Sequence, residues 1–213
     1  MKKIYLMASA ILLAATVSAQ SLKPIKLVTP SKDRGTSIMQ SLANRQSVRE
    51  FSEKKLSEQD LSDVIWAACG INRPAEGKRT SPTAMNKQDV DLYVFLAEGV
   101  YLYDAKNHSL TPVAAGDHRP LISDRQPTIN KAPAILLMVS DLARFDVNVG
   151  DDVKREFGAL DVGIVSQNIS LFCAGCGLVT VPRAFMDKEK LKTLLKLSDT
   201  QVLMLNNPVG YPK

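Results

Sequence analysis

The feature that most constrains the fold is the distribution of apolar residues between positions 89 and 140. The segment DVDLYVFLAEGVYLYDAKNHSLTPV alternates in polarity and turns at Glu98–Gly99, which predicts two paired strands. The run AILLMVS at 134–140 is apolar throughout and has the length of a strand, as expected where both faces of a sheet are covered. Because a hairpin joins antiparallel strands, the sheet cannot be wholly parallel.

Helical patterns alternate with these strands. The clearest begins at Ser57, an N-cap residue followed by Asp60 three positions later, and ends at Gly70 after apolar residues at helical spacing. Further helices are expected at 37–45, 154–177 and 188–197, and a last strand in VLMLNNPVGYPK. The predicted class is α+β.

The segment 154–177 should be a central helix. Gly158, Ala159 and Gly163 are small, which predicts that this helix is closely packed. Gln167 and Asn168 lie among apolar neighbours. Since buried amides need partners, we expect them to form a hydrogen bond between helices.

The amino terminus has the layout of a secretory signal. Two lysines precede an apolar run that begins at Ile4 and ends in the small-residue pattern Val17-Ser18-Ala19, which predicts a signal peptide at 1–19. A membrane anchor is the alternative, but it needs about 20 apolar residues. We expect an exported protein, periplasmic or secreted, without a stable membrane anchor after cleavage. Residues 20–36 are expected to form an extended arm before a single domain at 37–213.

Net charge argues against a nucleic-acid-binding protein, and cysteine content argues against a fold framed by disulfides. The formal charge of +5 becomes +3 when the two signal-peptide lysines are removed, and this charge is too small and too evenly spread to indicate a nucleic-acid partner. It is compatible with a site for one anionic ligand. Three cysteines leave at least one thiol unpaired, so disulfides are not the frame of the fold.

Basic residues alternate in the segment RQSVREF. If the segment is extended, Arg45, Ser47 and Arg49 point the same way, and two guanidiniums with a hydroxyl make a suitable phosphate clamp. An exposed basic turn beside two glutamates is the alternative, and the residues alone allow both. The polar segment RTSPTAMNKQ at 79–88 is likewise either a solvated loop or a cradle for a ligand.

Four motifs follow one another along the chain: RQSVREF, RTSPTAMNKQ, DVGIVSQN at 161–168, and GLVTVPRAF with VGYP near the carboxyl terminus. In this order and spacing the chain resembles the FMN-dependent nitroreductases, in particular the SagB/ThcOx-type dehydrogenases, from about Ser37 to Lys213. The resemblance implies a mainly antiparallel sheet flanked by helices, FMN as cofactor, and a homodimer with FMN at the subunit interface. The helix that contains DVGIVSQN would form much of the dimer contact.

The resemblance also assigns residues to the cofactor. Segment 45–49 and Lys213 would hold the phosphate, segment 82–88 would run along the flavin with the Asn86 side chain at the ring edge, and loop 182–185 would direct backbone N–H groups at the flavin O4 and N5. The expected cofactor-binding residues are Arg45, Gln46, Ser47, Arg49, Pro82, Thr83, Ala84, Met85, Asn86, Gln88, Pro182, Arg183, Ala184, Phe185 and Lys213.

The loop 182–185 departs from the family pattern. Relatives often carry a glycine near Ala184 and an acidic or apolar residue near Arg183. Close backbone approach to the flavin is therefore less favoured here. Arg183 could instead stabilise a reduced anionic flavin or bind an acidic substrate.

The implied activity is electron transfer from a donor, NAD(P)H in most relatives, through FMN to a small organic acceptor. No side chain is expected to act as an acid or base, because the cofactor performs the hard step. If the protein is exported, its electron donor could be a different molecule, because nicotinamide cofactors are scarce outside the cytoplasm. An exported flavin-binding or carrier protein with little turnover is the alternative.

Other site classes find little support. Cys173 and Cys176 have the spacing of a redox pair, which would make a thiol–disulfide protein. They lie in the apolar end of a helix, where a thiolate is not stabilised, so we favour core cysteines, as for Cys69. His108 and His118 lack companions at metal-ligand spacing, and no G-x-S-x-G or phosphate-binding glycine loop occurs.

Overall fold

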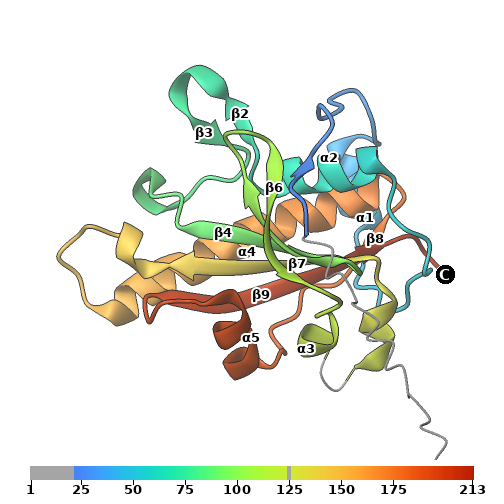
Figure 1. Ribbon diagram of the computed structural model, residues 1–213. Coiled ribbons are helices and arrows are strands. Elements are labelled where there is room, and N and C mark those ends of the chain that lie inside the picture. The colour runs from blue at the N-terminus through green and yellow to red at the C-terminus, as the bar shows by residue number, and fades with distance from the viewer. Residues whose placement is uncertain (1–21, 124–125) are drawn as a thin grey trace, which may run out of the picture.

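A central sheet organises the residues that the computed structural model describes, 22–123 and 126–213 (Figure 1). Its order is β1-β6-β5-β4-β7-β9-β8, and all neighbouring strands are antiparallel. The strands are β1 (Ile25–Lys26), β4 (Val90–Phe95), β5 (Gly99–Asp104), β6 (Ser109–Ala115), β7 (Ala134–Asp141), β8 (Val179–Thr180) and β9 (Gln201–Gly210), with β2 (Ile71–Arg73) and β3 (Lys78–Arg79) in a separate hairpin. The predicted mainly antiparallel sheet is confirmed.

Helices cover both faces of this sheet. On one face α2 and α4 close the apolar layer and α1 packs on α4, whereas α3 and α5 lie on the other face. The helices are α1 (Ile38–Asn44), α2 (Glu58–Cys69), α3 (Pro120–Ser123), α4 (Asp151–Gly175) and α5 (Lys188–Leu195), with short 3-10 helices η1 (Pro74–Glu76), η2 (Ala84–Asn86), η3 (Pro127–Lys131) and η4 (Leu142–Arg144). The expected α+β class is confirmed.

The α2 helix begins where the sequence predicts. Ser57 Oγ accepts a hydrogen bond from the Asp60 N–H at 3.0 Å, and Gly70 follows the last turn. This contact satisfies one of the amides that every helix start leaves without an intrahelical partner.

The predicted hairpin is the first half of a longer meander. β4 and β5 pair as expected, but the chain turns again and β6 pairs with β5. Asp104 makes this second turn, because its Oδ1 accepts from the N–H groups of Lys106 (2.9 Å) and Asn107 (3.1 Å). The expectation of two strands in this segment was wrong in number, since the segment forms three.

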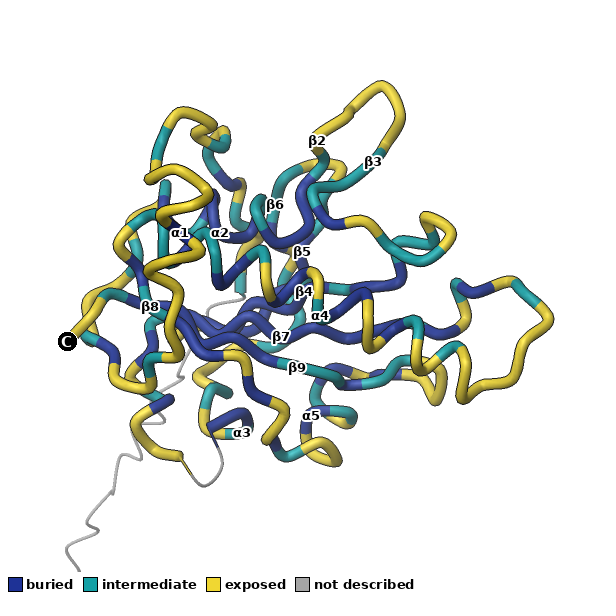
Figure 2. Tube along the Cα trace, turned by 180° about the vertical axis from the view of Figure 1, so that it is seen from behind, coloured by how far each residue is buried: buried dark blue, intermediate teal, exposed yellow. Residues whose placement is uncertain are grey.

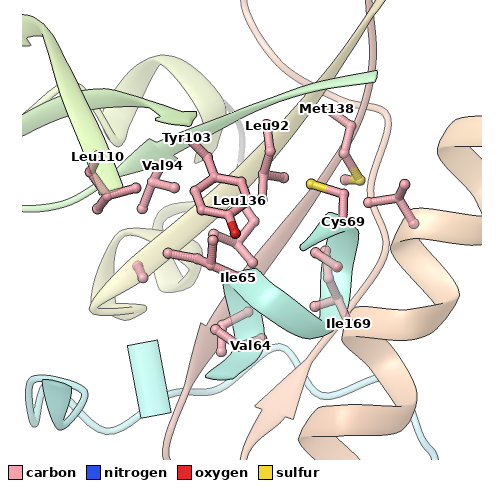
Figure 3. Packing of buried hydrophobic residues seen from close by; sticks show 14 of the residues in the cluster. Val64, Ile65, Cys69, Leu92, Val94, Tyr103, Leu110, Leu136, Met138 and Ile169 are labelled. Atoms are coloured by element: carbon pink, nitrogen blue, oxygen red, sulfur yellow. The ribbon is translucent and has the colours of Figure 1, made fainter. Parts of the chain in front are cut away.

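Alternation of side chains along β4 divides the core into two layers. Leu92 and Val94 join Leu136 on the face that α2 and α4 cover, and Figure 3 shows how the two helices close this layer. Tyr93 and Phe95 point to the opposite face. Figure 2 shows that burial follows the strands, while the outer sides of the helices are exposed.

The α4 helix crosses one face of the sheet close to its predicted bounds. A Cβ at Gly158 would lie 2.2 Å from Ser140 Oγ of β7, whereas a Cβ at Gly163 would meet no described atom within 4 Å. The prediction of close packing is therefore confirmed at Gly158 and is wrong at Gly163. Length and composition alone would also allow α4 to cross a membrane, although 44% of its apolar window is buried inside the protein.

The described part of the amino-terminal arm, 22–36, is bound to the domain. β1 extends the sheet beside β6, and Arg34 forms salt bridges with Asp60 (2.6 Å) and Asp63 (3.0 Å) of α2. The predicted signal peptide at 1–19 lies outside the described residues.

Candidate functional site

The RQSVR segment that follows α1 is extended and lies beside β8. Val48 N–H donates to the Thr180 carbonyl oxygen at 3.0 Å, and Ser47 forms a parallel β-bridge with Thr180. Arg45, Ser47 and Arg49 alternate along this backbone and are all exposed. The predicted extended conformation is confirmed.

This segment carries unbalanced positive charge. Neither Arg45 nor Arg49 forms an ion pair with a residue that the structure describes. Lys213 lies near them, with its Nζ 3.6 Å from Glu50 Oε2, and both of these side chains are mostly exposed. An anionic ligand would find the cations Arg45, Arg49 and Lys213 here.

A hollow of about 210 Å³ opens beside the RQSVR segment. Gln46 and Val48 line it together with Ser170 of α4 and Thr180 of β8. Pockets for cofactor-sized ligands usually measure about 300–1,000 Å³. One chain would therefore enclose only part of such a ligand.

The loop that follows β8 lies next to this hollow. The backbone N–H and carbonyl of Arg183 are both bonded to Asn206, at 2.8 and 2.7 Å, so the amide of Arg183 is not available to a ligand. Pro182 has no N–H to offer. Ala184 and Phe185 are exposed, and their N–H groups have no acceptor in the described chain. The backbone donors expected in this loop are thus those of Ala184 and Phe185.

The Arg183 side chain points into the protein. Its Nη1 donates to the Ile122 carbonyl oxygen (3.1 Å) and to Asn206 Oδ1 (3.0 Å), and its Nε donates to Gln126 Oε1 (3.0 Å). The residue is only 7% exposed. These bonds tie the loop to the α3–η3 segment, so the geometry does not support the two ligand-directed roles suggested for this side chain.

The second polar cluster is a strained loop that contains η2. Met85, Asn86 and Gln88 have φ angles of 52°, 55° and 49°. The left-handed conformation costs a non-glycine residue roughly 1–2 kcal/mol. Such backbone persists only where its surroundings hold it, and it is concentrated at ligand sites.

Several hydrogen bonds hold this loop. Ala84 N–H donates to both carboxylate oxygens of Asp161 of α4, at 3.0 and 2.9 Å. Gln88 N–H donates to Thr83 Oγ1 at 2.8 Å, and Arg144 Nη1 donates to the Gln88 carbonyl oxygen at 2.6 Å. The sequence assigned no role to Asp161, although a carboxylate on the apolar part of a helix signals a specific partner.

Some side chains of this loop are hydrogen-bonded within the fold, whereas others are exposed. The Gln88 side chain accepts from Arg79 Nε at 2.9 Å and donates to the Gly77 carbonyl oxygen at 3.0 Å, so it fixes the loop to the β2–β3 hairpin. Met85 and Asn86 are exposed, and the Asn86 amide makes no hydrogen bond within the described ranges. Asn86 is therefore open to a ligand, whereas the Gln88 side chain is engaged in the fold.

The two clusters meet α4 at different points along its length. The chain that leads into α1 bonds to the carboxyl-terminal end of α4, where Thr36 N–H donates to the Gly175 carbonyl oxygen. The RQSVR segment lines its hollow with Ser170, whereas the strained loop is held at Asp161 near the middle of the helix. The helical rise of about 1.5 Å per residue separates Ser170 from Asp161 by roughly 14 Å. Figure 1 shows η2 and the carboxyl terminus on opposite sides of the protein. One chain brings 45–49, 182–185 and Lys213 together but leaves 82–88 apart.

An exposed stripe runs along the part of α4 that the two clusters meet. Leu160 (60% exposed), Ile164 and Gln167 follow one another at helical spacing, and Ile38 of α1 is 61% exposed. The hydrogen bond predicted for Gln167 and Asn168 does not form among the described residues, because this side of the helix faces outward. Exposed apolar residues gathered in this way mark an interaction surface.

The cysteines do not form a reactive pair. All three are free thiols in the described chain, and Cys69 and Cys173 are buried, as expected for core residues. Burial raises the pKa of the Cys173 and Cys176 thiols, and raises that of Cys69 to about 11. A raised pKa lowers the thiolate fraction, which is the opposite of what a redox pair needs.

A larger cavity of about 480 Å³ contains none of the predicted site residues. Apolar Leu56 and Leu96 line it with Glu53, Arg119 and Lys131. Its charges are of both signs, so it indicates no particular ligand.

Comparison with known proteins gives a consistent picture. A model of the nitroreductase family matches residues 42–211. A Methanocaldococcus jannaschii protein whose name assigns it as a nitroreductase is 31% identical over 179 residues, 79% of this chain and 88% of that protein. A crystal structure from Ralstonia eutropha, also described as a nitroreductase, has a TM-score of 0.84 at 30% identity and covers 91% of each chain. A Staphylococcus epidermidis structure described as an NAD(P)H:FMN oxidoreductase has a TM-score of 0.62 at 14% identity, covers 88% of this chain and 91% of that one, and shows a shared fold.

Proposed function

Because this chain belongs to the nitroreductase family, we propose that it binds FMN and passes electrons from a donor, NAD(P)H in the first instance, to a small organic acceptor. The observation that carries the proposal is the pair of exposed guanidiniums, Arg45 and Arg49, which lack carboxylate partners in the described chain and lie near two open backbone amides. Within the family, we place the chain in the SagB/ThcOx-type branch, whose order of motifs it shares.

The RQSVR segment suits a phosphate. Arginine forks form charge-assisted hydrogen bonds to phosphate oxygens, and Ser47 adds a hydroxyl between Arg45 and Arg49. Lys213 supplies a further cation at the same end of the fold. The small hollow beside Gln46 gives room for the adjoining part of the ligand.

The loop after β8 suits the ring of the flavin. The open N–H groups of Ala184 and Phe185 can donate to a ring edge, and donors aimed there stabilise negative charge that develops on reduction. Phe185, which is 73% exposed, offers apolar surface beside them. When bound, FMN supplies the reversible uptake of a hydride, so the chain needs only to bind and orient the reactants.

A homodimer would complete the site. In a twofold dimer with α4 antiparallel to its partner, the strained loop of one chain comes to the RQSVR segment of the other, because the two meet α4 at Asp161 and Ser170, on either side of Ile164. The same arrangement would bury the exposed stripe around Leu160 and Ile164. Met85 and Asn86 would then contact a flavin held mainly by the partner subunit.

We also propose that the protein is exported, on the basis of the signal-like segment 1–19. The electron donor would then have to be delivered outside the cytoplasm. Mass measurement of the protein from its native cell tests this point. An amino terminus at Gln20 is expected, and a chain that retains Met1 would contradict export by this signal.

Reduction of the bound flavin tests the function. The chain without residues 1–19 is mixed with FMN, freed of excess cofactor and titrated without oxygen with NADH or NADPH, with free FMN as the control. We expect a yellow protein whose flavin absorbance bleaches with one or both donors. A yellow protein that neither donor bleaches would favour a flavin carrier or another donor, and a protein that stays colourless would contradict the proposal.

A further inference from the structure

Two buried carboxyl groups lie directly beneath the strained loop. Asp89 follows the loop and is fully buried, and Asp161 of α4 is 3% exposed. Asp89 Oδ2 accepts a hydrogen bond from Ser140 Oγ at 2.5 Å, whereas its Oδ1 has no partner among the described residues. Both oxygens of Asp161 accept from Ala84 N–H. The proposed cofactor site uses neither carboxyl group.

This arrangement does not favour two negative charges. Ser140, which donates to Asp89, packs against α4 so closely that a Cβ at Gly158 would lie 2.2 Å from its Oγ, and Asp161 follows Gly158 by one helical turn. The two buried carboxyl groups are therefore neighbours, and two ionised carboxylates that share a buried site repel strongly. Nowhere in the described ranges do three or more His, Cys, Asp or Glu side chains gather in a way that could hold a metal ion between them. A proton on Asp89 Oδ1 would remove one charge, and the new O–H would donate to Asp161.

We propose that Asp89 and Asp161 share one proton, and that this pair is the positioning element that fixes the backbone of residues 83–88. Asp161 holds the Ala84 N–H with both oxygens. Asp89, anchored by Ser140, donates its proton to Asp161 and keeps that carboxylate in place. The strain at Met85 and Asn86 makes the loop depend on this anchor.

Other charged groups around the pair are already engaged. Arg144 donates to the Gln88 carbonyl oxygen and to Asp91 Oδ1, both at 2.6 Å. Lys87 pairs with Asp146. By element, the charged or titratable groups around the pair are Asp91 of β4, Asp141 of β7, Arg144 of η4 and Lys87 of the loop. None of them replaces the shared proton.

Titration should loosen the loop. Burial, with Asp161 nearby, raises the pKa of Asp89 to about 7. An aspartate in the unfolded chain has a pKa of about 3.9, so the folded chain binds the proton more tightly. The stabilising contribution is therefore complete below about pH 4 and is lost as the pH rises through about 7.

The first test needs no cofactor. Infrared spectroscopy of the wild type at about pH 6 should show a protonated carboxyl band that fades toward about pH 8.5 and is absent in Asp89→Asn. Amide exchange of residues 84–88, corrected for the intrinsic rate, should be at least roughly tenfold faster at the higher pH. In Asp89→Asn it should be independent of pH, because the amide can always donate to Asp161. The control, Asp104→Asn in a distant turn, should keep the wild-type pH dependence.

A wild type without the protonated band, or an Asp89→Asn variant with unchanged pH dependence, would overturn the shared proton. If Asp89→Asn does not fold, the pH dependence of the wild-type carboxyl band and of the wild-type amide exchange rates is sufficient to test the shared proton. The effect on the cofactor rests on the proposed function and is measured separately. FMN affinity should fall over the same pH range in the wild type but not in Asp89→Asn. A protein that binds no FMN would contradict the proposed function, while the spectra and exchange rates would still judge the pair.

Discussion

Arg183 and Asn206 are joined through both their backbones and their side chains. Their backbones exchange hydrogen bonds of 2.8 and 2.7 Å, and Arg183 Nη1 donates to Asn206 Oδ1 at 3.0 Å. Asn206 Nδ2 donates in turn to the Phe185 carbonyl oxygen at 3.2 Å. This buried pair sets the position of the loop whose amides we assign to the flavin.

Replacement of Arg183 should lower the stability of the folded protein. Arg183→Ala would leave Asn206 Oδ1 and the Ile122 carbonyl oxygen without a donor, which should lower the free energy of unfolding by about 3 kcal/mol. Urea denaturation of the cofactor-free protein measures this. Arg49→Ala, at an exposed arginine, is the matched control and should stay within about 0.5 kcal/mol of the wild type. Equal stability of the two variants would mean that Arg183 is not a structural residue.

Replacement of Gly158 and of Gly163 in α4 should change stability in opposite directions. A methyl group at Gly158 would collide with Ser140 Oγ, so Gly158→Ala should destabilise the protein by about 1–3 kcal/mol. At Gly163 nothing described lies near the added Cβ, and Gly163→Ala should stabilise the helix by about 0.5–1 kcal/mol. Thermal unfolding of both variants checks this. A shift of the same sign in both would contradict the packing described.

His108 should make stability depend on pH. Its Nδ1 lies 2.9 Å from the Tyr103 hydroxyl and its Nε2 lies 2.8 Å from Ser62 Oγ, and burial lowers the pKa of His108. In the unfolded chain the imidazole takes up a proton near pH 6.5, before the folded chain does. The unfolded state then binds more protons, so stability should fall as the pH drops below about 6.5.

His108→Asn isolates this effect, because asparagine tolerates the left-handed φ of 46° at this position. Unfolding by urea at several pH values should show a shallower loss of stability below about pH 6.5 than in the wild type. The same slope in both proteins would exclude His108 as its source.

Arg45 should contribute to FMN affinity and not to the fold. Loss of hydrogen bonds to a charged ligand costs about 1.5–3 kcal/mol, so Arg45→Ala should raise the Kd for FMN roughly 10- to 100-fold. Fluorescence titration with FMN measures this. Lys188→Ala, which removes an exposed cation at the start of α5, is the control and should bind like the wild type. Unchanged affinity in Arg45→Ala would remove the phosphate assignment.

Local patterns predicted the elements of this fold well. The Ser57 cap, the turn at Glu98–Gly99 and the apolar strand at 134–140 each depend on neighbouring residues, and each is confirmed. The turn at Asp104 was missed, because its hydrogen bonds come from an aspartate inside an otherwise strand-like run. The sequence also did not show that Gly163 faces outward, since small size alone does not tell which side of a helix is covered.

The site was harder to predict because its contacts join distant parts of the chain. Arg183 is bonded to Ile122 and Gln126, so its inward direction depends on a segment far away in the sequence. Asp161 likewise accepts a hydrogen bond from the Ala84 N–H, which is far from it in the sequence. The order of motifs suggests one cofactor, but only their positions along α4, at Asp161 and near Ser170, show that 82–88 and 45–49 lie apart within one chain.

The central claim is that a flavin bridges two copies of this chain, and native mass spectrometry with FMN tests it most directly. We predict a homodimer with one FMN per chain. Ile164→Arg, which places a charge on the exposed stripe of α4, should yield a folded monomer that has lost FMN. Thr193→Arg, on an exposed position of α5, should remain a dimer with FMN. A monomer that binds FMN as tightly as the wild type, or a dimer that takes up none, would contradict this account.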